Sequence, residues 1–265
     1  MPGLAHDRRG SGEPLVLVHG LGSRRKAWNP VIERVAAERE VLAVDLPGFG
    51  DSPPDPAGTR LTVGDHADRL QGFFAQAGLD RPHVGGNSMG GGVALELGCR
   101  GAVRSVTVFS PIGFWGKPGQ QWCRWALRAG YEAGRRRPAS MPPRAVLATT
   151  RLGMFVLSFG RPFQVPAEEV LDAAQSGLAA PGFREALRYG LEFRFEDPGR
   201  LPQMPVTVAW GRRDLLLPFW TQSRRARQRL PWARHLSLPR CGHIPFHDDP
   251  ELCAAVLLAG SGRRG

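Results

Sequence analysis

The sequence predicts an α/β protein in which a mostly parallel sheet is flanked by helices and carries an inserted helical cap. Short runs rich in β-branched residues alternate with helical segments in the first and last parts of the chain. Strands that are separated by helices pair in parallel through right-handed crossovers. Between residues 111 and 201 the alternation stops, and only helices and loops are expected. With 265 residues, 42% of them hydrophobic, the chain is long enough for one core of residues 1–110 and 202–265 and one cap of residues 111–201.

Each expected strand is a short apolar run that ends near a glycine or a polar residue. Six such runs cover residues 15–18, 41–45, 82–86, 103–109, 205–210 and 235–238. After the second strand, Thr62 and Asp65 have the spacing of a capping box, and an apolar stripe follows at helical intervals. The sequence therefore predicts a helix over residues 63–77 that covers one face of the sheet.

The expected cap contains an aromatic, arginine-rich segment at residues 122–132, an apolar helix at 145–159 and amphipathic helices at 167–177 and 182–193, with a proline-rich break at 138–143. Its large apolar side chains are expected either to pack the cap on the sheet or to line a pocket, because ligand pockets are lined mainly by such residues. They are Phe114, Trp115, Trp122, Trp125, Met154, Phe155, Phe159, Phe163 and Phe183. Their number favours a substrate with an apolar acyl or alcohol portion.

Ser88 lies at the junction of the third expected strand and the helix that follows it. Gly86 and Gly90 stand two residues before and two residues after it, which is the sequence pattern of a nucleophile elbow. A strand that turns into a helix within one residue forces that residue into a strained backbone region and leaves no room for neighbouring Cβ atoms. Because the chain contains 34 glycines, the same pattern could also mark a flexible loop, so the rest of the chain has to decide.

Two more polar residues follow glycine breaks beyond expected strands. Asp214 comes after the strand at 205–210, and His243 after the strand at 235–238. Ligands bind at the carboxyl ends of the strands in open α/β sheets, so both side chains are expected near Ser88. A serine hydroxyl needs an adjacent base to take its proton, and the base needs a third group to fix its tautomer. Ser88, Asp214 and His243, in this order along the chain, supply the hydroxyl, the orienting group and the base.

Other histidines and carboxylates fit these roles less well. No glycine break precedes His247, and Asp45 heads a Pro-Gly loop that it is expected to tie together. Asp248 and Asp249 are predicted to cap the last helix and to place negative charge in its first turn.

The first expected strand breaks into a glycine-rich turn that begins at His19, which is predicted to brace the turn through its ring nitrogens. Such a turn can aim a backbone N–H at the nucleophile. The oxyanion hole is therefore predicted to combine the N–H of Leu21, or of its neighbour Gly22, with that of Met89, the residue after the elbow serine. The substrate is expected to contact Gly20, Gly22, Trp115, Phe155 and Ile244.

Five motifs in this order resemble the α/β-hydrolase fold family, and the likeness runs over nearly the whole chain. They are the His19-Gly20 turn, the loop at residues 45–52, the Ser88 elbow, Trp210-Gly211 followed by Asp214, and Gly242-His243 followed by Asp249-Pro250. The resemblance implies that Ser88 is the nucleophile, His243 the general base and then the general acid, and Asp214 the group that orients the imidazole. It also implies two-step acyl transfer, without metal or organic cofactor, on an ester of an apolar small molecule, as in carboxylesterases and lipases. The antiparallel pair of strands that usually opens this sheet must be shortened, since only 14 residues precede the first buried strand.

Three other functions share this framework. The residues around Ser88 also resemble the elbow of hydrolases that cleave carbon–carbon bonds in ring-fission products. Those relatives usually carry a tryptophan shortly after the catalytic histidine, and here Ile244, Pro245 and Phe246 follow instead. Cofactor-free haloperoxidases use the same three groups. A ligand receptor on this fold is the non-enzymatic alternative. Haloalkane dehalogenases and epoxide hydrolases need an aspartate at the elbow, and Ser88 excludes both in their usual form.

The formal net charge of +11 raises the question of an anionic partner. Of the 35 basic residues only Lys26 and Lys117 are lysines, and the arginine runs are dispersed and lack interleaved stacking aromatics. We therefore expect a solvated basic surface and no nucleic-acid partner.

The four cysteines have no paired spacing, so neither a disulfide framework nor a metal site is expected from Cys99, Cys123, Cys241 and Cys253. The first 13 residues lack the apolar stretch of a signal peptide, and no window approaches the roughly 18 apolar residues of a membrane span. The sequence thus predicts a cytoplasmic protein without stable membrane insertion. Its oligomeric state stays open, with a homodimer among the arrangements.

Overall fold

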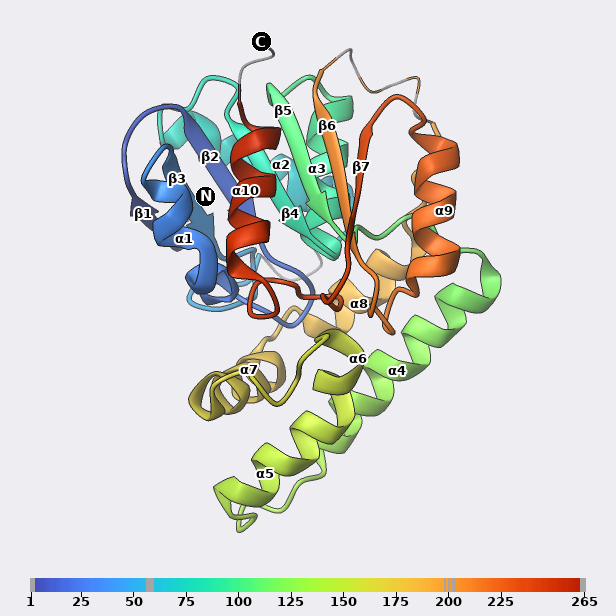
Figure 1. Ribbon diagram of the computed structural model, residues 1–265. Helices are drawn as coiled ribbons and strands as arrows, with labels where there is room; N and C mark the ends of the chain where they lie inside the picture. Colours follow the sequence, from blue (N-terminus) through green and yellow to red (C-terminus); the bar gives the residue numbers. More distant parts are fainter. Residues whose placement is uncertain (1–2, 56–59, 198, 200, 202–203, 263–265) are drawn as a thin grey trace.

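A seven-stranded sheet forms the centre of the computed structural model, which describes residues 3–55, 60–197, 199, 201 and 204–262. The strands are β1 (His6–Arg9), β2 (Pro14–Val18), β3 (Glu40–Val44), β4 (His83–Asn87), β5 (Ser105–Phe109), β6 (Val206–Gly211) and β7 (Arg234–Leu238). They lie in the order β1-β3-β2-β4-β5-β6-β7 (Figure 1). Only β1 runs antiparallel to its neighbour, β3, and all other pairs are parallel. The predicted mostly parallel sheet is confirmed.

The strand β1 is absent from the six predicted from the sequence. Its residues, His6 to Arg9, are all polar and mostly exposed, so they form no apolar run by which a buried strand is recognised. A charged edge strand of this kind also protects the sheet from pairing with other chains. In the described part of the chain, β1 alone provides the antiparallel opening of the sheet.

Helices cover both faces of the sheet because alternate strand residues point to opposite sides. Val16 and Val18 of β2 belong to the larger core cluster, with residues of α2 (Val63–Gln76), α3 (Met89–Cys99) and α9 (Phe219–Arg229). Leu15 and Leu17 of the same strand pack on the other side. There they meet α1 (Asn29–Ala36) and α10 (Pro250–Gly260), which lie in front of the sheet in Figure 1.

Helix α2 begins where the sequence predicts. The Thr62 hydroxyl accepts a hydrogen bond from the Asp65 N–H at 3.1 Å, and the Asp65 carboxylate accepts one from the Thr62 N–H at 3.0 Å. This is the predicted capping box, and it satisfies two backbone donors at the helix start. The predicted apolar stripe lies in the core from Val63 to Phe74.

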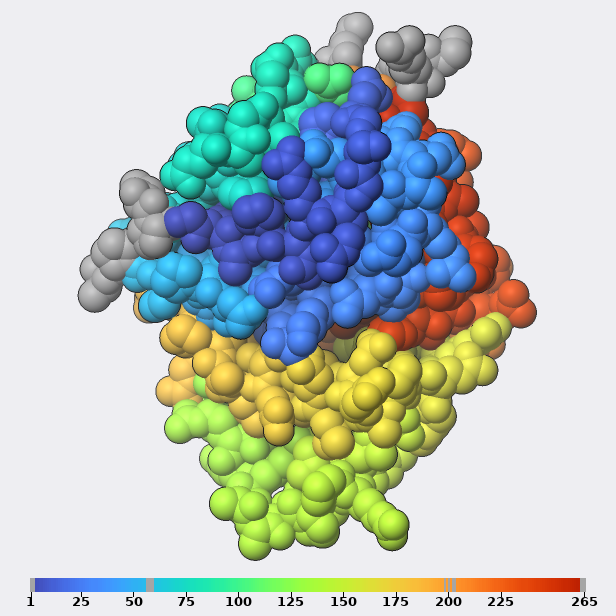
Figure 2. Space-filling model, turned by 90° about the vertical axis from the view of Figure 1, so that its left-hand side faces the viewer, coloured from blue at the N-terminus to red at the C-terminus, as the bar shows by residue number. Residues whose placement is uncertain are grey.

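Between β5 and β6 the chain leaves the sheet and forms an insertion of helices. They are α4 (Lys117–Arg135), α5 (Pro143–Thr150), α6 (Val156–Ser158), α7 (Ala167–Ala179) and α8 (Phe183–Glu192). Figure 1 places them beyond the carboxyl ends of the strands, and Figure 2 shows the yellow and green insertion packed against the blue and red core. The predicted return to the core at residue 202 falls outside the described residues. No helix in the described ranges is long and apolar enough to cross a membrane.

The single helix predicted at 145–159 is wrong. Helix α5 ends at Thr150, a five-residue π-helical turn follows at Arg151–Phe155, and α6 adds only three residues. Gly153 breaks the helix, since its φ of −93° and ψ of −107° lie outside the helical region. A helix breaks at a glycine at little cost in free energy, because glycine has a low preference for the helical conformation. The apolar pattern of the sequence continues across Gly153 and therefore does not predict the break.

Candidate active site

Ser88 is the single residue between strand β4 and helix α3. Its φ of 55° and ψ of −115° belong to a backbone region that residues with a side chain rarely adopt. Backbone hydrogen bonds hold it there: its N–H donates to the Phe109 carbonyl at 3.0 Å, and its own carbonyl accepts from Gly92 and Ile112 at 3.1 Å each. The strand–turn–helix expected around Ser88 is therefore present, and it lifts the hydroxyl above the carboxyl edge of the sheet.

The two glycines that flank Ser88 are required by contact with backbone. A Cβ on Gly86 would stand 2.2 Å from the Gly90 carbonyl oxygen, and a Cβ on Gly90 would stand 2.2 Å from that of Val18. Both distances are far below any real carbon–oxygen contact. The sharp turn thus depends on the absence of side chains at these positions.

His243 and Asp214 form a buried hydrogen-bonded pair. The distance between His243 Nδ1 and Asp214 Oδ2 is 2.9 Å, and the two residues are each only 2% exposed. The other carboxylate oxygen, Oδ1, accepts the Leu217 N–H at 2.7 Å. Because one oxygen is fixed by the backbone and the other faces Nδ1, the imidazole keeps its Nε2 for another partner.

Ser88 and His243 line the same cavity, as the order of the motifs predicts. Among the described residues the Ser88 hydroxyl and the His243 ring make no direct hydrogen bond. Catalytic hydrogen bonds of unliganded enzymes are often long and tighten when substrate binds.

Asn87 holds the loop of His243 beside the elbow. Its side-chain amide donates to the His243 carbonyl at 2.9 Å and to the Phe109 carbonyl at 3.0 Å, and the residue is 3% exposed. Asn87 is not among the site residues predicted from the sequence. The available signal is a polar amide at the end of an otherwise apolar strand.

The turn after β2 brings backbone close to Ser88. A Cβ on Gly20 would lie 3.1 Å from Ser88 Cβ, which is tighter than most contacts of real Cβ atoms, so the turn passes close to the elbow. Met89 is the first residue of α3, and the first N–H groups of a helix have no intrahelical acceptor. Leu21 and Met89 both line the cavity of Ser88. Their N–H groups are the predicted oxyanion donors.

His19 braces this turn, as expected. Its Nε2 accepts the Leu46 N–H at 3.0 Å, and its Nδ1 lies 2.7 Å from the Gly20 carbonyl. Burial lowers the pKa of His19, which favours the neutral ring that this pattern of one donor and one acceptor needs. Asp45 likewise ties its loop together by accepting the N–H groups of Arg25 and Asp51.

The cavity that contains Ser88, called the inner cavity below, has a volume of about 90 Å³. Its walls are mainly apolar and include Ile112, Leu187, Leu191 and Leu216. Cys123 lines it too, but burial, and after it the Asp214 carboxylate, raises the pKa of this thiol to about 12. The Cys123 thiol therefore stays protonated at neutral pH and is a poor nucleophile.

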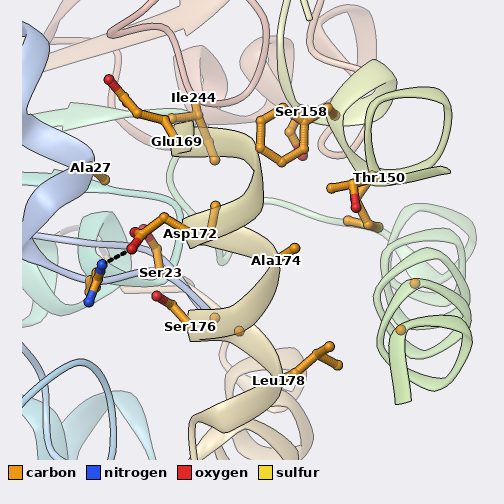
Figure 3. A pocket seen from close by; sticks show the side chains of 18 of the residues that line it. Ser23, Ala27, Thr150, Ser158, Glu169, Asp172, Ala174, Ser176, Leu178 and Ile244 are labelled. Atoms are coloured by element: carbon orange, nitrogen blue, oxygen red, sulfur yellow. Dashed lines mark hydrogen bonds and ion pairs between the residues drawn. The ribbon is translucent and has the colours of Figure 1, made fainter. Parts of the chain in front are cut away.

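A larger outer cavity of about 540 Å³ adjoins the inner one. Both are lined by Leu21, Ser23, Leu127, Met154, Ser158 and Ile244. Figure 3 shows α7 along the outer cavity, with Asp172 pointing toward the turn after β2. Two side-chain contacts fix this helix to the core: Asp172 forms an ion pair with Arg24, and Glu169 Oε2 lies 2.6 Å from His247 Nε2.

The residues expected to contact substrate all line these cavities. Gly20 and Trp115 line the inner cavity, Gly22 and Phe155 line the outer one, and Ile244 lines both. The Trp115 ring is fixed by its N–H, which donates to the Phe193 carbonyl at 3.1 Å.

Some large apolar side chains of the insertion do not point inward. The buried ones are Phe114, Trp115, Phe155, Phe159 and Phe183. Trp125 and Phe163 are each 64% exposed and Trp122 is 37% exposed, and none of these three lines either cavity.

The role predicted for Asp248 is wrong. Asp249 caps α10 by accepting the Leu252 N–H at 3.1 Å, whereas Asp248 turns away from that helix. Its carboxylate accepts the N–H groups of Gly160, Arg161 and Gly242, each at 2.8 Å. Burial raises the pKa of Asp248, although the three donors oppose this shift. Asp248 thus joins the insertion to the loop of His243 through backbone groups that the sequence does not reveal as its partners.

The same segment of the insertion also bonds to residues next to both members of the buried pair. The Ile244 N–H donates to the Ser158 carbonyl at 2.8 Å, and the Leu215 N–H donates to the Leu157 carbonyl at 3.3 Å. We call residues 157–161 and their partners the seam. It fixes the end of α6 directly against the loops that carry His243 and Asp214.

Comparison with known proteins matches residues 15–256 to the family described as the alpha/beta hydrolase family. The chain is 26% identical over 249 residues to the 2-hydroxy-6-oxo-2,4-heptadienoate hydrolase of Pseudomonas putida, over 88% of this chain and 83% of that protein. The crystal structure of a membrane phospholipase A, a bacterial virulence factor, is similar at 26% identity with a TM-score of 0.77, over 97% of this chain and 83% of that one. A thermophilic esterase from Thermogutta terrifontis is similar at 25% identity with a TM-score of 0.75, over 96% and 91%.

Proposed function

Because the chain belongs to the alpha/beta hydrolase family, we propose that it is a serine hydrolase that cleaves carboxylic esters of apolar small molecules. The observation that carries the proposal is the buried hydrogen bond between His243 and Asp214 at the wall of a cavity that Ser88 also lines. A base with a fixed tautomer, facing a hydroxyl on a strained turn, is suited to nucleophilic acyl transfer.

In the first half of the reaction, His243 Nε2 takes the proton of the Ser88 hydroxyl as Oγ bonds to the ester carbonyl carbon. The carbonyl oxygen becomes negative and accepts hydrogen bonds from the N–H groups of Leu21 and Met89. The carbon–oxygen bond to the alcohol then breaks, and His243 gives its proton to the departing oxygen.

In the second half, a water molecule replaces the alcohol. His243 takes a proton from the water, whose oxygen attacks the acyl carbon and forms a second oxyanion in the same place. The bond to Ser88 Oγ breaks, Oγ recovers the proton from His243, and the acid leaves. Asp214 stabilises the charged imidazole in both halves without taking its proton.

The sizes of the two cavities support a substrate with unequal ends. An inner cavity of about 90 Å³ accepts only a few heavy atoms on one side of the carbonyl, and its apolar walls favour hydrocarbon. The outer cavity of about 540 Å³ lies within the usual range of about 300–1,000 Å³ for small-molecule sites. We therefore expect esters with one short apolar group and one extended group to be cleaved fastest.

The test uses Ser88→Ala and a fluorophosphonate, which labels an activated serine. The native protein should be labelled and should hydrolyse activated esters, whereas Ser88→Ala should lose labelling and about 10⁴-fold or more of its turnover while keeping its circular dichroism spectrum. Near-native esterase activity in Ser88→Ala would show that another group is the nucleophile. A native protein that is neither labelled nor active would point to a ligand-binding role instead.

Hydrolysis of a carbon–carbon bond is the second candidate, and the likeness to the Pseudomonas putida ring-fission hydrolase favours it. It would use the same serine and histidine. A 2-hydroxy-6-oxo-dienoate and a matched series of esters, assayed with one enzyme preparation, separate the two functions. The ester proposal fails if the dienoate is cleaved with the higher kcat/KM.

A further inference from the structure

Three tryptophans and a leucine form an exposed apolar surface outside both cavities. Trp125 is 64% exposed, Trp220 is 71% exposed, and Leu215 and Trp122 are 48% and 37% exposed. We call these four residues the tryptophan face. Soluble proteins rarely leave several large apolar side chains together in water unless the surface meets a partner.

The tryptophan face comes from two separate parts of the chain that lie against each other. The Trp122 ring stacks on that of Trp125 with 5.6 Å between centroids, and its N–H donates to the Leu215 carbonyl at 2.8 Å. This bond joins α4 to the loop that leads into α9, where Trp220 lies. In Figure 1 the first turns of α4 lie next to the start of α9.

Exposed basic side chains lie on the same elements as the tryptophan face. Exposed residues of α4 include Lys117, Arg124 and Arg128, and exposed residues near or on α9 include Arg212, Arg224 and Arg227. Trp220, Arg224 and Arg227 follow one another at helical spacing, so they share one side of α9. The Arg212 guanidinium lies over the Trp220 ring, 5.5 Å from its centroid.

No carboxylate neutralises these cations within the described part of the chain. None of the six has a described carboxylate oxygen within 4 Å of its charged nitrogens. Between Phe219 and Arg229, helix α9 contains no acidic residue at all. The surface therefore carries a net positive charge around an apolar centre.

We propose that the tryptophan face docks on an anionic lipid surface. Tryptophan is suited to the boundary of a bilayer because its ring is apolar while its N–H is polar. Arginines around it attract anionic headgroups, and their stems can lie along the apolar boundary. The binding is peripheral, since the face consists of side chains on two surface helices and needs no segment to cross the membrane.

The charge of the face argues against a second copy of this chain as the partner. A two-fold contact would place the same patch of each copy against the other and bring the basic rims together. A single-stranded nucleic acid would need free ring faces for base stacking. Trp122 and Trp125 already stack on each other, and Arg212 lies over Trp220, so these contacts would have to give way.

The test measures co-sedimentation of the full-length protein with vesicles. One set consists of phosphatidylcholine, and the other of equal parts of phosphatidylcholine and phosphatidylglycerol. The native protein should bind the anionic vesicles at low salt, release them as salt is added, and leave the neutral vesicles unbound. Fluorescence of the tryptophans should shift to shorter wavelength on binding.

Two variants divide the surface into its apolar and charged parts. The double variant Trp125→Ser and Trp220→Ser should lower the partition coefficient roughly tenfold. The triple variant Arg124→Gln, Arg128→Gln and Arg224→Gln should lower it roughly 100-fold, about fivefold for each charge. Trp232→Ser is the matched control, because Trp232 is 51% exposed but follows the far end of α9.

Circular dichroism and turnover of a short soluble ester should be unchanged in all three. Equal binding to both vesicle types, or native binding by the double and triple variants, would overturn the proposal. So would a concentration-dependent dimer in sedimentation velocity that these variants abolish. Tight binding of a single-stranded oligonucleotide without any binding of anionic vesicles would overturn it in favour of a nucleic-acid partner.

Discussion

The side chain of Asn87 donates a hydrogen bond to the backbone carbonyl of His243 across 2.9 Å. The residue before the elbow serine thus fixes the position of the loop that carries the imidazole, although the two lie 156 positions apart. The same amide bonds to the Phe109 carbonyl, so the ends of β4 and β5 and the loop of His243 meet at one side chain. The relative position of Ser88 and His243 depends on this contact.

Asn87→Asp should lower kcat and change KM much less. The substitution replaces an amide that donates to two carbonyls with a carboxylate that repels them, and the loss of one such buried contact is worth about 1–3 kcal/mol. We expect kcat to fall about 10- to 100-fold. Steady-state kinetics and fluorophosphonate labelling rates measure the effect, with Asn87→Ala as the variant that removes the donor without adding charge. An unchanged kcat in both variants would contradict a positioning role for Asn87.

Asp248→Ala and Asp249→Ala should differ in stability, although the residues are neighbours. Asp248→Ala leaves three N–H groups, one buried and two partly buried, without their acceptor, which should cost about 3 kcal/mol. Asp249→Ala removes one helix cap and should cost about 1 kcal/mol. Urea unfolding at neutral pH gives both values. Equal losses would mean that the seam contributes little to the folded state.

Gly90→Ala should severely destabilise the protein, whereas Gly72→Ala should not. The new Cβ at position 90 would overlap the Val18 carbonyl, and overpacking against backbone costs about 3 kcal/mol or more. Gly72 lies on the exposed side of α2 with no atom near its Cβ position, so alanine there should stabilise the helix by about 1 kcal/mol. Thermal unfolding compares them. A well-folded Gly90→Ala protein would show that the turn can relax.

His66 should make the protein sensitive to moderate acid. Burial, and after it the neighbouring His19, lowers the pKa of His66 to about 4, and neither ring nitrogen has a hydrogen-bond partner among the described residues. Between pH 6.5 and 4 the unfolded chain binds a proton that the folded protein excludes, so stability falls as the pH falls. The loss across this window is about 3 kcal/mol.

His66→Leu should remove this part of the pH dependence. Urea unfolding at pH 7 and pH 5 measures it, with His6→Leu as the control because His6 is exposed on the edge strand. If the native protein and His66→Leu lose stability in parallel between these pH values, His66 is not the responsible group.

The parts of the fold that could be predicted from the sequence are those in which local pattern and burial agree. Buried strands such as β2 consist of uninterrupted apolar residues, and α2 begins at a capping box that needs only Thr62 and Asp65. The strand β1 could not be predicted, because an edge strand pairs through its backbone groups and needs no apolar pattern in its sequence. The break at Gly153 could not be predicted, because the apolar stripe of the sequence continues on both sides of it.

The candidate site also contains residues that could be predicted from the sequence and contacts that could not. Ser88, Asp214 and His243 could be located because each follows a strand end in a known order of motifs. The contacts of Asn87 and Asp248 could not, since both residues act on backbone groups far away in the chain, and only the folded structure brings those groups near. The number of aromatic residues also does not predict whether Trp122 and Trp125 point inward or outward, because this depends on how α4 is rotated against its neighbours.

The seam has a consequence for how the site can open and how it can be altered. Because the end of α6 shares hydrogen bonds with the residues next to Asp214 and His243, that end cannot swing outward without disturbing the loops that carry this pair. If the proposed site opens, we expect the movement in the helices before the irregular turn at Gly153. A chimaera that receives another protein's insertion would inherit working chemistry only if the graft reproduces these anchoring carbonyls in register.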